Sequence, residues 1–83
     1  MIFLTKADVL NIHRRTIAEQ GGSEGIRDKN LLESALAAAE NRYFYENVDL
    51  AACAATYAFH LSKAHAFIDG NKRVAAVSAE VFY

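Results

Sequence analysis

The stretch Leu-Ala-Ala-Cys-Ala-Ala-Thr-Tyr-Ala-Phe-His-Leu, residues 50–61, contains only two polar residues, Thr56 and His60. Its alanines favour a helix, and neither glycine nor proline interrupts it. Because a helix that is apolar on nearly every side needs neighbours to cover it, this segment should lie in the centre of a bundle. Asp49 is suited to cap its first turn, and we expect the helix to run from Leu50 to about Ala64.

Two helices are expected before this central one. The first should begin at Thr5, because Asp8 completes a capping pair with it, and Gly21-Gly22 can supply a left-handed cap at its end. Asp28 is a good N-cap for the second. Each has an apolar face, formed in the first by Val9, Ile12, Thr16 and Ile17 and in the second by Leu31, Leu32, Ala35, Leu36 and Ala39.

The rest of the chain completes an all-α prediction. Residues 41–47, which include Tyr43, Phe44 and Tyr45, are expected to form an aromatic loop, and a last helix should begin near Asn71 and run to the end. The chain has no proline and no strand-like alternation of useful length. We therefore predict one domain, residues 1–83, built as a compact helical bundle of about four helices.

Composition excludes several classes of function. The net charge of −1 gives no whole-domain electrostatic case for binding nucleic acid or an anionic membrane. The segment from Leu50 to Leu61 is too short to span a bilayer, and Met1 to Leu4 run directly into charged residues, unlike a signal peptide. The single cysteine, Cys53, lies among alanines and is interpreted as a reduced core thiol of a cytoplasmic protein.

The connection between the last two predicted helices concentrates chemically useful residues, His65-Ala-Phe-Ile-Asp-Gly-Asn-Lys-Arg73. A helix start exposes unpaired backbone N–H groups and the positive end of the helix dipole, so the start near Gly70-Asn71 suits an anion. Lys72 and Arg73 add positive charge that opposes this dipole, which suggests a negatively charged ligand. Asp69 is a hard oxygen ligand suited to Mg²⁺, and the imidazole of His65 can accept a proton.

Each member of this group also has an ordinary structural interpretation. A histidine at a helix end is usually a cap or half-buried, an aspartate before a helix is usually an N-cap, and a Lys-Arg pair is usually solvated. Phe67 is expected in the core in either case. Only the ordered combination favours a functional site.

That combination, His-x-Phe-x-Asp-Gly-Asn-Lys-Arg, resembles the signature of the Fic/Doc family, with every defining position filled. The resemblance extends to Gly21-Gly22, Gly25 to Asp28 and Leu31 to Leu36, which are similar to the amino-terminal region of the Doc (death on curing) toxin branch. It implies that His65 is a general base and that Asp69 binds Mg²⁺. It further implies that Gly70, Asn71, Lys72 and Arg73 bind phosphates, that Phe67 anchors the loop, and that Tyr43, Phe44 and Tyr45 form a flap that docks the target.

The resemblance also implies a reaction and its partners. Fic relatives with a second glycine transfer AMP from ATP to a hydroxyl, whereas Doc-type members have lysine at that position, here Lys72, and transfer the γ-phosphoryl group. We therefore expect a cytoplasmic bacterial toxin that phosphorylates a Ser/Thr hydroxyl of a translation elongation factor, with ATP and Mg²⁺, and that a separate antitoxin silences. Doc-type domains usually continue through a further helix, so we expect a truncated domain with uncovered apolar surface that favours homo-oligomers.

Four alternatives remain open. The chain can transfer AMP from ATP to a protein hydroxyl, as Fic relatives do, or it can be an inactive nucleotide-binding or antitoxin-binding module. A DNA-binding helix-turn-helix is suggested by the locally basic His13-Arg14-Arg15, although the balanced charge argues against it. A metal site from His60, His65 and Asp69 is disfavoured, because the two histidines do not share a helical face.

Overall fold

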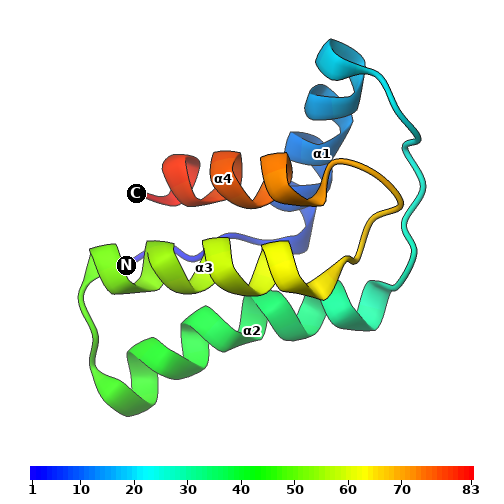
Figure 1. The fold of residues 1–83 in the computed structure, drawn as a ribbon. Coiled ribbons are helices and arrows are strands. Elements are labelled where there is room, and N and C mark those ends of the chain that lie inside the picture. The colour runs from blue at the N-terminus through cyan, green and yellow to red at the C-terminus, as the bar shows by residue number, and fades with distance from the viewer.

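The computed structural model describes residues 1–83 and contains four helices, α1 (Lys6–Gln20), α2 (Lys29–Glu46), α3 (Leu50–Ala64) and α4 (Asn71–Phe82). α3 packs against both α2 and α4, and α1 packs across α4 while also touching α2 (Figure 1). The only extended pairing is an isolated antiparallel bridge between Ile26 and Phe67. The predicted all-α bundle of about four helices, with the 50–64 helix at its centre, is confirmed.

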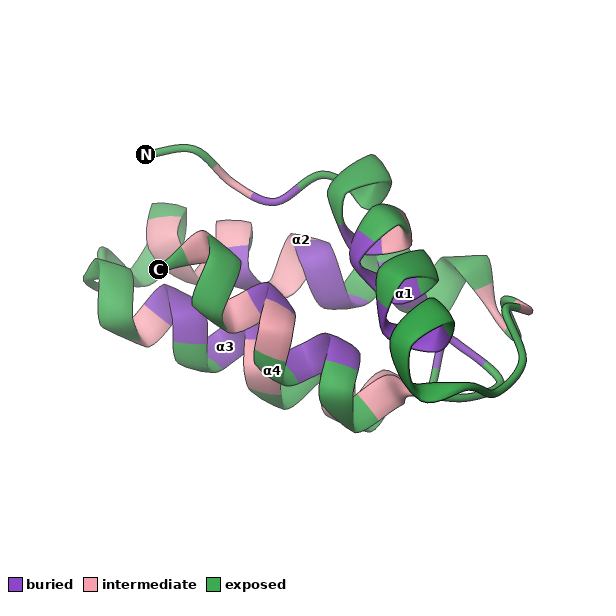
Figure 2. Cartoon of the chain, turned by 90° about the horizontal axis from the view of Figure 1, so that it is seen from above, coloured by how far each residue is buried: buried purple, intermediate pink, exposed green.

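The core lies where α2, α3 and α4 meet and where α1 closes one end (Figure 2). Tyr57 of α3 is fully buried, and its hydroxyl accepts a hydrogen bond of 3.1 Å from the backbone N–H of Leu4, which ties the amino-terminal segment to the bundle. Cys53 is also fully buried, and desolvation raises the pKa of its thiol, so the thiol is protonated and a poor nucleophile. None of the four helices combines the length and apolarity needed to cross a bilayer.

Local capping explains where three of the helices begin. Thr5 and Asp8 form the reciprocal capping box at α1, Asp28 accepts from two backbone N–H groups of α2, and Asp49 accepts from the N–H of Ala52 in α3. All three caps agree with the sequence. α4 differs, because its N-cap is Gly70 and no side chain caps it.

The predicted aromatic loop at residues 41–47 is wrong. α2 continues to Glu46, and Asn47 ends it in the left-handed conformation, with φ of 53°. Residues 41–46 include neither glycine nor proline, so nothing interrupts the intrahelical hydrogen bonds before that cap. Tyr43, Phe44 and Tyr45 therefore belong to the last turns of a helix.

The end of α1 differs in detail from the prediction. Gly21 has a positive φ of 81°, but its ψ of 176° is extended, so the chain leaves the helix without a left-handed helical cap. The Gly21 N–H still donates to the carbonyl of Ile17 and closes the last turn. This departure sends residues 22–28 back along the molecule as an extended segment, a course that matters for the site described next.

Candidate functional site

The loop from His65 to Gly70 connects the end of α3 to the start of α4. His65 is the C-cap of α3 and adopts the left-handed conformation, with φ of 49°. Its carbonyl accepts a hydrogen bond of 2.8 Å from Nε of Arg27. Its imidazole is exposed and makes no hydrogen bond within the protein, so the ring is available to an external group.

The extended segment before α2 holds this loop from one side. The backbone N–H groups of Arg27 and Asp28 both donate to the carbonyl of Ala66, at 2.7 and 3.0 Å. The N–H of Ile68 donates to the carbonyl of Gly25 at 3.1 Å. These bonds flank the bridge between Ile26 and Phe67, so two short extended segments, about 40 positions apart in sequence, brace each other.

Phe67 and Asn71 fix the middle of the loop. The Phe67 ring is 2% exposed. The Asn71 side chain accepts from the N–H of Phe67 at 3.0 Å and donates to the carbonyl of Phe67 at 2.8 Å. The Asn71 carboxamide thus closes the loop, while the backbone N–H of Asn71, in the first turn of α4, can face a phosphate.

Asp69 has one carboxylate oxygen occupied and one without a protein partner. Its Oδ2 accepts a hydrogen bond of 2.9 Å from the backbone N–H of Ser23, and a Cβ on Gly22 would lie 3.3 Å from the same carboxylate. The structure gathers no group of three or more His, Cys, Asp or Glu side chains able to hold a metal. A single oriented carboxylate instead fits Mg²⁺ that is shared with nucleotide phosphates and keeps several waters.

The start of α4 carries uncompensated positive charge. Gly70 is left-handed, with φ of 81° and ψ of 13°, a conformation that glycine adopts without strain. The first turn has no acidic residue and no side-chain cap, and neither Lys72 nor Arg73 belongs to one of the two ion pairs in the structure. Free backbone N–H groups, the positive end of the helix dipole and two exposed cationic residues therefore occur together in the first turn of α4.

Arg73 is oriented by a neutral neighbour. With the Gln20 carboxamide turned so that its oxygen faces Arg73, this oxygen accepts from Nε at 2.7 Å and from Nη2 at 2.6 Å. The contact fixes the plane of the guanidinium without neutralising its charge. Gln20 was not among the residues predicted for the site, since nothing in the local pattern connects the end of α1 to Arg73.

The structure brings together residues 65–73, but it separates the aromatic residues from them. Tyr43, Phe44 and Tyr45 lie at the far end of α2, whose first turn adjoins the loop (Figure 1). At ~1.5 Å per residue they are about 20 Å along that helix, and a target-docking role for these three residues stays a prediction. None of the three surface cavities is lined by a residue of 65–73, so the anion would bind at an open surface.

His13 is the second residue that the sequence did not connect to the site. Its ring is 3% exposed, so it does not contribute to a basic surface with Arg14 and Arg15 as the helix-turn-helix interpretation required. The helical period places position 13 on the buried face with Val9, Thr16 and Ile17. That periodicity was the available signal, because a histidine on a buried face needs a hydrogen-bond partner.

Comparison with known proteins agrees with the geometry. The model of the Fic/DOC family matches residues 3–83. The chain is 31% identical over 83 residues to Protein kinase doc of Escherichia phage P1, and the alignment covers 99% of this chain and 66% of the relative. The chain thus spans slightly less than two thirds of the length of that curated relative.

Proposed function

Because the chain belongs to the Fic/DOC family, we propose that it is a toxin of Doc type that transfers the γ-phosphoryl group of ATP to a Ser/Thr hydroxyl of a translation elongation factor. The observation that carries the proposal is the uncapped start of α4 with Gly70, Lys72 and Arg73, which a short loop connects to His65 and its exposed imidazole. The similarity to a relative named Protein kinase doc supports kinase activity. Within the motif, Lys72 is the residue by which this chain resembles the Doc branch.

The chain's own groups supply three parts of this chemistry. His65 accepts the proton of the target hydroxyl, whose oxygen attacks the γ-phosphorus while the bond to the β,γ-bridging oxygen breaks and ADP leaves. The free N–H groups of α4, with Lys72 and Arg73, bind and orient the phosphates. Asp69 would hold Mg²⁺ through its free carboxylate oxygen, and the ion would neutralise charge on the phosphates when bound.

The deciding experiment uses ATP labelled at either the α or the γ phosphate, with purified elongation factor and the His65→Ala variant as the control. We expect γ-label on the factor with the wild-type chain and none with the variant. Label retained from the α position would replace phosphoryl transfer with AMP transfer. Nucleotide binding with no transfer from either label would favour the inactive binding module.

Gln20 provides a separate test of the phosphate site. Gln20→Glu should raise the Kd for ATP by roughly 3- to 10-fold, because a carboxylate at this place pairs with Arg73 and cancels part of the charge offered to the phosphates. Titration of ATP by calorimetry would measure this change. Gln20→Leu is the matched control, since it removes the orienting oxygen without adding charge. Equal weakening by both variants would exclude charge cancellation as the cause.

We also propose two kinds of protein partner. The resemblance to Doc-type toxins implies a separate antitoxin protein that binds and silences the toxin. Apolar side chains that remain exposed, among them Phe59 at 56% and Val81 at 61%, offer surface to such a chain or to a second copy. Sedimentation at increasing concentration, with and without the antitoxin, distinguishes these two partners.

A further inference from the structure

We infer that His13 is a positioning residue that sets Asp69, the residue before the N-cap of α4, in its binding geometry. This inference deepens the proposed function, because it concerns how the same site holds Mg²⁺ with ATP. It assigns a role to a buried imidazole that the transfer chemistry itself does not use. The key juxtaposition is a ring on α1 that lies against Phe67, Asp69 and Gly70 of the loop.

Three contacts place His13 beneath the loop. Its ring stacks on the Phe67 ring, with centroids 3.9 Å apart and an interplanar angle of 10°. Its Nε2 lies 2.9 Å from the carbonyl oxygen of Asp69. A Cβ built on Gly70 would lie 3.9 Å from Cδ2 of the same ring, so the ring also packs under the N-cap of α4.

The hydrogen bond fixes the direction of the Asp69 backbone. Since a carbonyl oxygen can only accept, Nε2 of His13 carries the proton and donates it. This bond holds the Asp69 carbonyl toward α1, while the Ser23 N–H separately holds the Asp69 carboxylate. The residue that would bind Mg²⁺ is thus fixed at two points, as metal ligands commonly are by the groups behind them.

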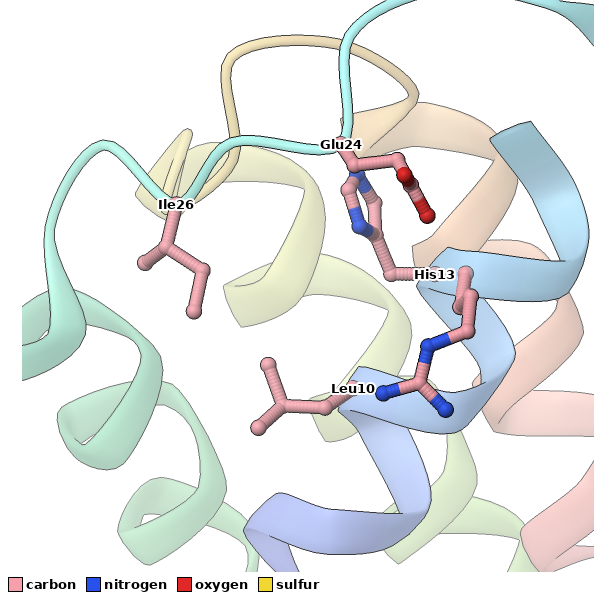
Figure 3. Close-up of a pocket in the computed structure, with 5 residues that line it drawn as sticks. Leu10, His13, Glu24 and Ile26 are labelled. Carbon is pink, nitrogen blue, oxygen red and sulfur yellow. The ribbon is translucent and has the colours of Figure 1, made fainter. Parts of the chain in front are cut away.

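The His13 ring also fills the space between a surface cavity and the loop. It lines a surface cavity of about 290 Å³ together with Leu10, Arg14, Glu24 and Ile26 (Figure 3). The imidazole separates this cavity from Phe67 and Asp69 of the loop. Truncation of His13 to alanine would extend the cavity beneath the loop. The variant would then lose both the packing against Phe67 and the hydrogen bond that orients Asp69. The test therefore needs substitutions that remove one of these contacts at a time.

Two substitutions separate the ring from its hydrogen bond. His13→Phe keeps an aromatic ring for Phe67 but cannot donate to the Asp69 carbonyl. His13→Gln keeps an N–H donor at a similar reach but loses the ring. For each variant, ATP binding is titrated with Mg²⁺, ATP binding in EDTA is the reference, and the melting temperature reports packing.

We expect opposite outcomes for the two variants. His13→Phe should melt within ~5 °C of the wild type, while the Mg²⁺ concentration for half-maximal ATP binding rises at least ~10-fold. His13→Gln should melt lower but keep that concentration within ~3-fold, and ATP binding in EDTA should be unchanged in both. Unchanged Mg²⁺ dependence in His13→Phe, or parallel shifts of melting and Mg²⁺ dependence in both variants, overturns the inference.

Amide exchange keeps this inference distinguishable from the proposed function. If the wild-type chain fails to bind ATP with Mg²⁺, the proposed function fails. The exchange rates of the Ser23 and Ile68 N–H groups, which are bonded to Asp69 and Gly25, then decide the inference. Faster exchange of these two amides in His13→Phe than in His13→Gln supports it, and equal or slower exchange overturns it.

Discussion

Replacement of His65 by asparagine should reduce phosphoryl transfer by roughly 10²- to 10⁴-fold, the usual contribution of a general base. The imidazole is exposed and bonds to nothing in the protein, so its loss removes little packing. Asparagine tolerates the left-handed backbone of this position, and the carbonyl held by Arg27 is retained. Initial rates of γ-label transfer, with melting temperature measured in parallel, check this expectation.

A comparison with His65→Ala separates chemistry from backbone strain. Alanine at φ of 49° should cost about 1 kcal/mol of stability that asparagine does not, while both variants lose transfer alike. ATP binding should stay within ~3-fold of wild type in both, because His65 does not belong to the phosphate-binding group. Transfer at wild-type rates in the asparagine variant would remove His65 from its proposed role.

Replacement of Phe67 by alanine should cost about 3–5 kcal/mol of unfolding free energy, a large share of what a domain of this size has. Phe67 is 2% exposed and stacks on His13, and its backbone is the point at which Asn71 closes the loop. The expected fall in melting temperature is at least ~12 °C. Thermal unfolding followed by circular dichroism at 222 nm, a general marker of helix, measures it.

Phe59→Ala is the matched control for this experiment. Phe59 lies on α3 and is 56% exposed, and its ring faces His60 and Lys63 at the surface. The same chemical truncation there should change stability by less than ~1 kcal/mol. If both phenylalanine variants melt alike, Phe67 does not anchor the loop.

Several features of the fold could be read directly from the sequence. The caps Thr5, Asp28 and Asp49 begin their helices as predicted, since a cap is a hydrogen bond to a residue two or three positions away. The buried faces of α1 and α2 follow the helical period, which also depends only on nearby positions in the sequence. In α2 the exception is Leu31, which is 37% exposed at the edge of the stripe.

The sequence was less informative about where α2 ends. Aromatic residues at 43–45 suggested a loop, but aromatic rings are compatible with a helix when no breaker precedes them. Phe3 packs against the rings of Tyr43 and Phe44, with centroids 5.7 and 5.8 Å apart. That support comes from the other end of the chain, so local pattern could not reveal it.

The sequence by itself thus determined the helices, their caps and the ordered motif from His65 to Arg73, because these depend on interactions within a few residues. Only the tertiary structure decided what holds the motif. Nε2 of His13 and the Asp69 carbonyl are 56 positions apart, and the Ser23 N–H and the Asp69 carboxylate are 46 positions apart. Such pairs meet only after α1 has packed on α4, and helical periodicity contains no information about which distant atoms will face each other.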